Sequence, residues 1–317
     1  MAQKIVLAGG SGHVGAALAR HWTEHDLVVL SRGPGLPGVR SVKWDGATLG
    51  AWVNEIDGAD VVVNLAGRSV NCRYTEANLQ EMMSSRVDST RVVGQAIAVA
   101  SRPPRVWLQS STATIYAHRF DRANDEAEGF IGGGEPGSER LWDRSVEIAK
   151  AWEQALAEAD TPHTRKVALR SAMTMSVDKR SVFDVLLGLA RKGLGGSLGT
   201  GQQYVSWIHE RDFGRALDFL IERDDLDGAV NICSPNPLPQ QEFAHDLRAA
   251  AGGMGAIPTP RWMIEIGTWL MRTESELVLK SRFVVPGRLL KAGFTFEFPE
   301  WASACRELVL RSQAQPR

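Results

Sequence analysis

The stretch that decides the fold is LAGGSGHVG, residues 7–15. Its first two residues end the apolar run 5–8, and it leads into small and apolar residues that favour a helix. Its glycines form a G-x-x-G-x-x-G pattern, in which one glycine permits a tight turn, one lets a pyrophosphate approach the backbone and one permits close packing. Free amides at the helix start would face the phosphates, whereas a tight turn without a ligand is the alternative. The expected cofactor contacts in this loop are Gly9, Gly12, His13, Val14 and Gly15.

The first half of the chain alternates apolar β-branched runs with helix-like segments. The runs are unbroken, as is typical of strands buried on both faces of a parallel sheet. Strand–helix repetition predicts right-handed crossovers and a doubly wound α/β sheet of the Rossmann type. Strands are expected at 4–8, 27–31, 61–66, 105–110 and 166–170, and helices at 14–25, 76–100 and 141–159.

The regular alternation of strand-like and helix-like segments ends after residue 170. A helix is expected at 182–192, followed by the glycine-rich stretch 193–202, which suits either a loop close to a substrate or a plain connection. A second helix is expected at 212–223 and a strand at 230–233, and proline-rich turns follow from 235. The domain prediction is a dinucleotide-binding domain over 1–170, joined by about 205–233. Residues 171–204 and 234–317 are expected to form a smaller α+β substrate lobe.

Composition narrows the class of protein. The 317 residues carry a formal net charge of −1, which gives no electrostatic reason to expect nucleic acid or an anionic membrane. Three scattered cysteines predict a reducing compartment and no cysteine-built metal site. No signal peptide and no apolar stretch of about 18–20 residues is found. We therefore expect a cytoplasmic protein, with an organelle matrix as the alternative, that does not span a membrane and binds no metal.

Cofactor choice is expected at the end of the second strand. An acidic residue there would hydrogen-bond the ribose of NAD, but the strand ends in Ser31-Arg32. A guanidinium and a hydroxyl suit a 2′-phosphate, which predicts NADPH; a solvated Arg32 is the alternative. Further cofactor contacts are expected from Leu65, Ala66, Gly67, Arg86, Ser110 and Ser111, with a structural role for Arg86 left open.

Motifs along nearly the whole chain carry a family resemblance. They are Gly9–Gly15, Ser31-Arg32, Asn64–Gly67, Arg73–Thr75, Ser85–Val87 with Thr90-Arg91, Ser110–Tyr116, Gly195–Gln202, Ser206–His209 with Asp212, Asn231–Phe243 and Val285–Phe296. The chain resembles the extended short-chain dehydrogenases/reductases, and more narrowly the epimerase-like proteins with a C-terminal domain of unknown function. The resemblance implies a small polar or nucleotide-linked substrate and a homodimer formed through the helices at 76–100 and 141–159.

The same resemblance implies a catalytic Ser or Thr and a Tyr-x-x-x-Lys pair on one helical face. Thr112 matches the hydroxyl position. With Glu153 aligned to the acidic residue four places beyond the lysine, Ser145 stands at the tyrosine position and Ala149 at the lysine position. Lys150 is one residue away, which turns it by about 100° around the helix. The usual pair is therefore absent.

Two other side chains are candidates for acid–base chemistry. Tyr116 lies four residues beyond Thr112, and His209 stands where extended members line the substrate cleft. A structural hydrogen bond is the alternative for each, and Asp212 is expected to cap or salt-bridge a helix. The sequence thus predicts an NADPH-binding, epimerase- or reductase-like protein with Thr112, Tyr116 and His209 as catalytic candidates. A non-catalytic NADPH sensor or regulatory protein is the alternative, and an empty scaffold the least favoured reading.

Overall fold

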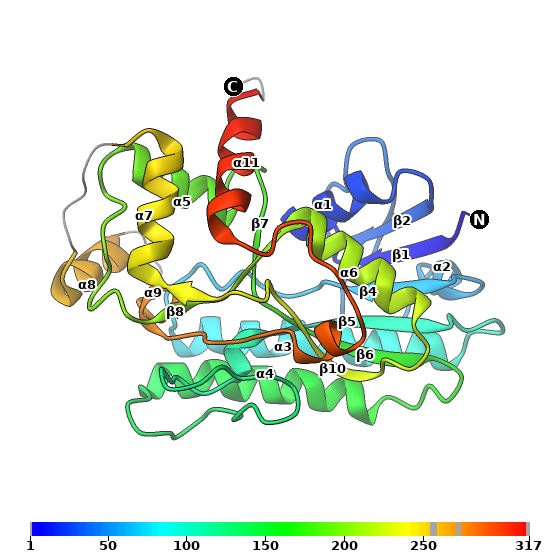
Figure 1. Ribbon diagram of the computed structural model, residues 1–317. Coiled ribbons are helices and arrows are strands. Elements are labelled where there is room, and N and C mark those ends of the chain that lie inside the picture. The colour runs from blue at the N-terminus through cyan, green and yellow to red at the C-terminus, as the bar shows by residue number, and fades with distance from the viewer. Residues whose placement is uncertain (1, 254–258, 271–273, 315–317) are drawn as a thin grey trace.

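A seven-stranded sheet forms the centre of the computed structural model, which describes residues 2–253, 259–270 and 274–314 (Figure 1). All pairs of neighbouring strands in it are parallel, in the order β10-β6-β5-β4-β1-β2-β3. The predicted doubly wound Rossmann sheet is confirmed. The strands are β1 (Lys4–Ala8), β2 (Asp26–Ser31), β3 (Arg40–Lys43), β4 (Val61–Asn64), β5 (Val106–Thr112), β6 (Arg165–Ser171) and β10 (Gly228–Ile232).

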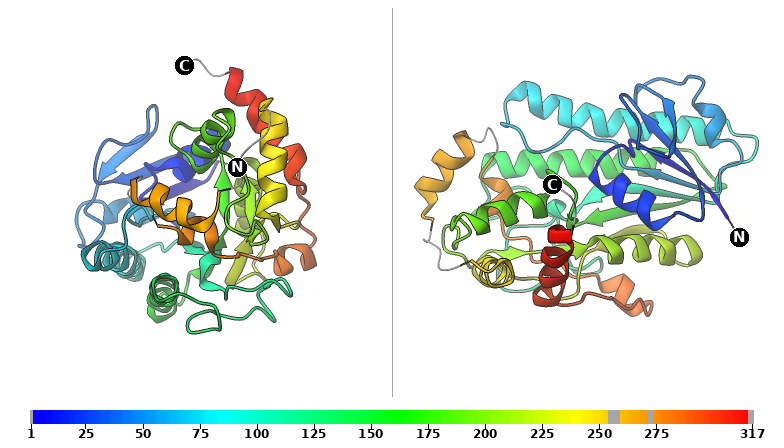
Figure 2. Two further views of the ribbon diagram at one scale, coloured as in Figure 1. Left: turned by 90° about the vertical axis from the view of Figure 1, so that its left-hand side faces the viewer. Right: turned by 90° about the horizontal axis from the view of Figure 1, so that it is seen from above.

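Helices cover both faces of the sheet. On one face α1 (His13–His21) packs against α6 (Glu210–Glu222), and on the other α3 (Glu76–Ala98) packs against α4 (Arg140–Glu158). Figure 2 shows α3 and α4 end-on, side by side. The apolar residues of the central strands alternate between two buried clusters, one on each face, because both sides of the sheet are covered.

The structure corrects some predicted boundaries. Helix α1 ends at His21 rather than His25, because the His25 amide donates to the Trp22 carbonyl in a turn before β2. Strand β4 ends at Asn64 rather than Ala66, because the Asn64 side chain accepts the Ala66 amide and turns the chain. Two short elements, β3 and α2 (Val53–Ile56), were not predicted.

The later residues add small elements beside the sheet (Figure 1). Among them α5 (Val182–Arg191), α7 (Gln240–Ala251) and α11 (Trp301–Ala314) share a buried cluster in which the Trp301 ring stacks on Phe243. No helix in the described parts of the chain is long and apolar enough to span a membrane. The remaining helices are η1 (Ala113–Ile115), α8 (Arg261–Leu270), α9 (Glu276–Leu279) and α10 (Gly287–Lys291). Two short strand pairs complete the described elements, the parallel pair β7 (Met173–Met175) and β9 (Trp207–His209) and the antiparallel pair β8 (Tyr204–Val205) and β11 (Leu238–Pro239).

Candidate functional site

The glycine turn joins β1 to α1. Gly9 has a φ of +71°, and a Cβ there would lie 2.6 Å from the Cα of Ala66. A Cβ on Gly15 would overlap the Gly10 carbonyl. Gly12, by contrast, is the N-cap of α1, has no side-chain cap, and a Cβ on it would meet nothing within 4 Å. The turn therefore leaves the amides and the positive dipole end of α1 open to an anion.

The end of β2 borders this turn. Ser31 is buried, and its hydroxyl donates to Ser11 Oγ at 3.1 Å and accepts the Gly33 amide at 3.2 Å. These hydrogen bonds position the backbone at the end of β2, next to Arg32. The Arg32 side chain is exposed, and no hydrogen bond or ion pair links it to the other described residues. A free guanidinium beside the open helix start suits a phosphate.

The chain after β4 crosses the turn closely. Asn64 is fully buried, donates to Gln109 Oε1 at 3.0 Å and accepts the Ala66 amide at 3.0 Å. The Leu65 amide donates to the Ala8 carbonyl at 2.8 Å. Gly67 follows, where a Cβ would lie 3.3 Å from Cζ of Arg86.

Arg86 is a cation with no carboxylate partner among the described side chains. Its Nη1 donates to the Met82 carbonyl at 3.0 Å, and its Cζ lies 5.0 Å from the ring centroid of Trp152. Burial lowers the pKa of Arg86 to about 10, which leaves the group charged at neutral pH. An uncompensated cation facing Gly67 favours an anionic ligand there.

The end of β5 divides the predicted hydroxyls between two environments. Ser110 and Thr112 are partly exposed, and Ser111 between them is buried, as the alternation along a strand requires. The Ser111 hydroxyl donates to Glu153 Oε1 at 2.6 Å. Thr112 Oγ1 accepts the Thr114 amide at 3.1 Å and so begins η1.

Tyr116 lies in a buried polar network. Its hydroxyl donates to Asn231 Oδ1 at 3.0 Å and accepts from Arg170 Nη1 at 2.9 Å. Burial raises the pKa of Tyr116, and the charge of Arg170 opposes that shift. Arg170 also pairs with both oxygens of Glu153, each at 2.8 Å. These contacts support the structural alternative for Tyr116, and its part in catalysis stays a prediction.

Helix α4 carries the positions where the resembling family has its tyrosine and lysine. The Ser145 hydroxyl donates to Glu276 Oε2 at 2.6 Å. Ala149 is buried in an apolar cluster with Ala113, Ile115 and Val284. A lysine at position 149 would place its stem and charge in this cluster, so the packing agrees with alanine.

Sequence reasoning missed the residues that reach Ser145 from the C-terminal region. Glu276 and Lys280 are on or next to α9, and both are buried. The phenol of Tyr74, from the loop after β4, also hydrogen-bonds with the Ser145 hydroxyl. No motif marks these three residues, because they meet only through the fold.

His209 is buried at the N-terminus of α6. Its Nε2 lies 2.9 Å from Glu307 Oε2, and its Nδ1 accepts the Arg211 amide at 3.1 Å. Its ring stacks on Phe298 with the centroids 4.0 Å apart. Burial lowers the pKa of His209, and Glu307 opposes the shift. Both ring nitrogens are occupied, which supports the structural alternative and leaves a catalytic role as a prediction.

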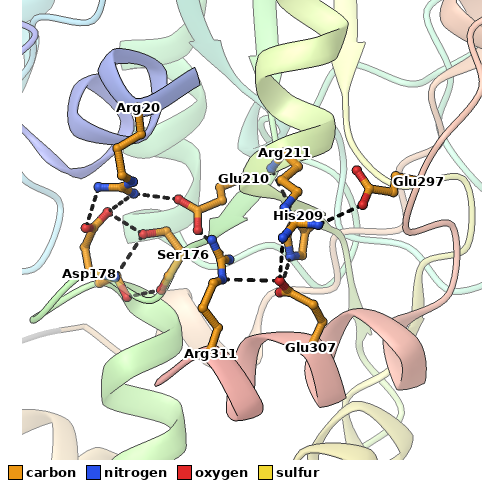
Figure 3. Close-up of polar contacts among 10 residues, drawn as sticks. Arg20, Ser176, Asp178, His209, Glu210, Arg211, Glu297, Glu307 and Arg311 are labelled. Atoms are coloured by element: carbon orange, nitrogen blue, oxygen red, sulfur yellow. Dashed lines mark hydrogen bonds and ion pairs between the residues drawn. The ribbon is translucent and has the colours of Figure 1, made fainter. Parts of the chain in front are cut away.

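A chain of ion pairs surrounds His209 (Figure 3). Arg20 of α1 pairs with both oxygens of Asp178 at 2.8 Å and with Glu210 at 2.7 Å. Arg311 of α11 pairs with Glu210 at 2.6 Å and with Glu307 at 3.3 Å. The network connects the helix after the glycine turn to the last helix of the chain.

Asp212 forms the ion pair expected of it. Its Oδ1 lies 2.7 Å from Arg215 Nη1. The carboxylate also accepts the backbone amides of Glu297 and Phe298, each at 2.8 Å. Asp212 therefore fixes the chain before α11 to the start of α6.

A cavity of about 860 Å³ lies between α4, the edge strand β10 and its neighbour β6. Lys150, Glu153, Lys166 and Arg170 are among the residues that line it. None of the residues of the glycine turn lines it. Its position sets it apart from the predicted cofactor site.

The fold and the turn define a nucleotide-binding protein of the Rossmann class, in which a ligand phosphate faces the first helix of the sheet. Residues 5–233 match the model of the NAD dependent epimerase/dehydratase family, and residues 259–308 match a domain of unknown function, DUF1731. The chain belongs to the NAD dependent epimerase/dehydratase family.

Relatives cover nearly the whole chain. The human epimerase family protein SDR39U1 is 29% identical over 96% of this chain and 99% of its own, and the Bos taurus protein of that name is 30% identical with the same coverage. The epimerase family protein YfhF of Bacillus subtilis is 24% identical over 96% of this chain and 97% of its own.

Solved structures agree with the fold. A crystal structure of human SDR39U1 (isoform 2) with NADPH has a TM-score of 0.83 at 27% identity, covering 96% of this chain and 99% of that one. A nucleoside-diphosphate sugar epimerase from Corynebacterium glutamicum has a TM-score of 0.74 at 23% identity, covering 98% of this chain and 58% of that one. The expected resemblance, to epimerase-like proteins with a C-terminal domain of unknown function, is confirmed.

Proposed function

We propose that the protein binds NADPH and acts as an epimerase- or reductase-like enzyme on a small polar or nucleotide-linked substrate. The observation that carries the proposal is the open N-terminus of α1 at Gly12, with the free Arg32 guanidinium at the end of the neighbouring strand. The NADPH in the crystal structure of the human relative supports the choice of cofactor.

The residues present fit this cofactor. The amides from Gly12 to Gly15 would hold the pyrophosphate, since a side chain at position 12 would fill the open space. Arg32 would pair with the 2′-phosphate, with Ser31 fixing the chain before it. Bound NADPH supplies a hydride. The further contacts proposed are Gly9, His13, Val14, Leu65, Ala66, Gly67, Arg86, Ser110 and Ser111.

Thr112 and Arg86 have separate roles in the proposal. Thr112 is partly exposed at the end of β5, where its hydroxyl would orient a substrate oxygen. Arg86 would hold an anionic group, because no carboxylate in the described structure compensates its charge.

Titration of the protein with NADPH and NADH tests the proposal. We expect NADPH to bind at least about tenfold more tightly, because one ionic contact to a phosphate contributes about 1.5–3 kcal/mol. Binding is followed by quenching of tryptophan fluorescence and by calorimetry. Equal affinities for the two nucleotides would contradict the assignment.

Replacing Gly12 by alanine is expected to weaken NADPH binding by about tenfold or more, because the methyl group enters the space proposed for the pyrophosphate. The folding stability should change little, since that Cβ meets no protein atom and the backbone φ is −85°. Calorimetric titration and thermal unfolding measure the two effects.

Gly188→Ala on α5 is the matched control, because its Cβ is also free of neighbours. It should leave NADPH affinity unchanged. Unaltered binding by the Gly12 variant would place the pyrophosphate elsewhere.

A non-catalytic NADPH sensor is the second candidate. Ser145 and the apolar packing of Ala149 favour it, because the usual tyrosine and lysine are both absent. The two candidates differ in one measurement, which is whether bound NADPH is oxidised in the presence of carbonyl compounds.

A further inference from the structure

The segment 274–282, which lies within the domain of unknown function, packs against three parts of the sheet domain. Glu274 accepts the Tyr74 amide at 2.7 Å, and the Ser281 amide donates to His118 Nδ1 at 2.7 Å. The Arg282 guanidinium donates to Thr114 Oγ1 at 3.1 Å. These contacts fix the segment beside η1 and α4.

Glu276 is the acidic residue that this segment directs at α4. Its carboxylate is 2% exposed, and Oε2 accepts the Ser145 hydroxyl at 2.6 Å. Its other oxygen, Oε1, is buried and has no hydrogen-bond partner in the described structure. Lys280 is the ion-pair partner of this oxygen, so its charge is compensated without a hydrogen bond.

Lys280 lies one helical turn further on. Its side chain is 1% exposed, and Nζ lies 3.9 Å from Glu276 Oε1 and donates to the Thr114 carbonyl at 2.9 Å. An ammonium and a carboxylate thus lie together behind Ser145. Thr114 connects them to η1, which begins at Thr112.

Ser145 is the member of this group that reaches the surface. It is partly exposed, whereas Glu276 and Lys280 behind it are buried. Ser145 also stands at the position where the usual family pattern has its tyrosine. The hydroxyl that a substrate meets at this position is therefore backed by a carboxylate from the C-terminal region.

We propose that Ser145, Glu276 and Lys280 form a proton relay that replaces the missing tyrosine–lysine pair and acts on a secondary alcohol or its ketone. The proposal rests on NADPH binding as proposed above. The alcohol oxygen gives its proton to Ser145 Oγ, while Ser145 gives its own proton to Glu276 Oε2. The alcohol carbon loses a hydride to NADP⁺, and its C–O bond becomes C=O.

The reverse direction returns the proton through the same atoms. Lys280 is a positioning residue, because its charge balances the Glu276 carboxylate before that carboxylate takes up the proton in each oxidation. Ser145 is the group that touches the substrate. Thr112, the last residue of β5, would hold the same substrate oxygen.

The electrostatics of the cluster favour proton exchange, because burial disfavours the charged forms of both Glu276 and Lys280. Burial raises the pKa of Glu276, and the charges of Arg282 and Lys280 oppose that shift. Burial lowers the pKa of Lys280 to about 8, and Glu276 opposes that shift. The other charged or titratable groups that act on the pair are Tyr74 from the loop after β4, Arg282 on the segment itself, Glu135 from the loop before α4 and Asp143 from α4.

The first test follows the proton on Glu276 in the whole protein. Protein labelled with ¹³C at the glutamate carboxyl groups is titrated by NMR, and the signal lost in Glu276→Gln is assigned to Glu276. We expect that signal to titrate at a higher pH than exposed glutamates, and to move in Ser145→Ala. A Glu276 signal that titrates with the exposed glutamates and ignores Ser145→Ala would overturn the relay.

The second test measures turnover with NADPH and phenanthrenequinone, together with a panel of aldehydes and ketones. Ser145→Ala and Glu276→Gln should each lower kcat by about 100-fold, while NADPH affinity stays within about twofold. Ser145→Thr keeps the hydroxyl and should retain most of the activity. Lys280→Met should shift the pH profile of kcat.

Glu274→Gln is the matched control, because it changes a buried carboxylate of the same segment that contacts the Tyr74 amide and Arg73 rather than the Ser145 hydroxyl. It should leave kcat and the pH profile unchanged. Unchanged kcat in Ser145→Ala, or a protein that binds NADPH but oxidises it with none of these compounds, overturns the relay and leaves NADPH binding standing. Failure to bind NADPH overturns the proposed function instead.

Discussion

Arg32→Ala is expected to weaken NADPH binding by about 30-fold and to leave NADH binding within about twofold of the native value. The reason is that the proposed pair between guanidinium and 2′-phosphate is charge-assisted, and such bonds contribute about 1.5–3 kcal/mol. NADH has no 2′-phosphate and would lose nothing. The Arg32 side chain is exposed in the structure, so its removal should not change the folding stability.

The measurement is a pair of titrations, with NADPH and with NADH, on the native protein and the variant. Arg191→Ala on α5 is the control, because it removes another exposed arginine and is expected to change neither affinity. Equal loss of affinity for both nucleotides in Arg32→Ala would assign Arg32 to the shared part of the cofactor rather than to the 2′-phosphate.

Arg170→Met is expected to lower the free energy of unfolding by about 3 kcal/mol. The substitution leaves the Glu153 carboxylate, whose side chain is only 18% exposed, without its cation, and breaking a largely buried pair from one side is strongly destabilising. Tyr116 would also lose the hydrogen bond that its hydroxyl accepts. Urea denaturation followed by circular dichroism measures the change.

Two further variants isolate the cause of this loss. The double variant Arg170→Met with Glu153→Met should recover part of the stability, because no unpaired charge remains. Arg144→Met removes an arginine whose partners Glu76 and Glu147 are exposed, and it should cost about 1 kcal/mol or less. A loss in Arg170→Met as small as that in Arg144→Met would show that the buried pair contributes little.

The sequence predicts the sheet well because its central strands are fully apolar. The run 4–8 is strand β1 with no change of boundary, since each of its apolar side chains is buried. Strand β3 was missed, because its residues Arg40–Lys43 are mainly polar and lie at the exposed edge of the sheet. A hydrophobic pattern predicts a strand only where its side chains are buried, and few side chains of an exposed edge strand are buried.

The residues of the candidate site were likewise predicted where a local sequence pattern marks them and missed where only the fold brings them together. The glycine spacing identifies the turn, because Gly9 needs its positive φ and Gly15 its close approach to Gly10. The contact of Ser145 with Glu276 joins residues 131 positions apart, and no local pattern records it. The position of Ser145 itself could be predicted, because Glu153 on the same helix aligns Ser145 with the tyrosine of the family pattern.

Because residues 274–282 pack against the sheet domain, the protein would become able to bind its cofactor and able to catalyse at different times during synthesis. The glycine turn, Arg32 and α4 are translated well before this segment, and N-terminal regions generally begin to fold first during synthesis. A nascent chain that stops short of Glu274 holds the parts proposed for the nucleotide, but Ser145 still lacks its carboxylate. The ability to bind a cofactor would therefore precede the ability to use it, and the emergence of residues 274–282 from the ribosome would decide when chemistry begins.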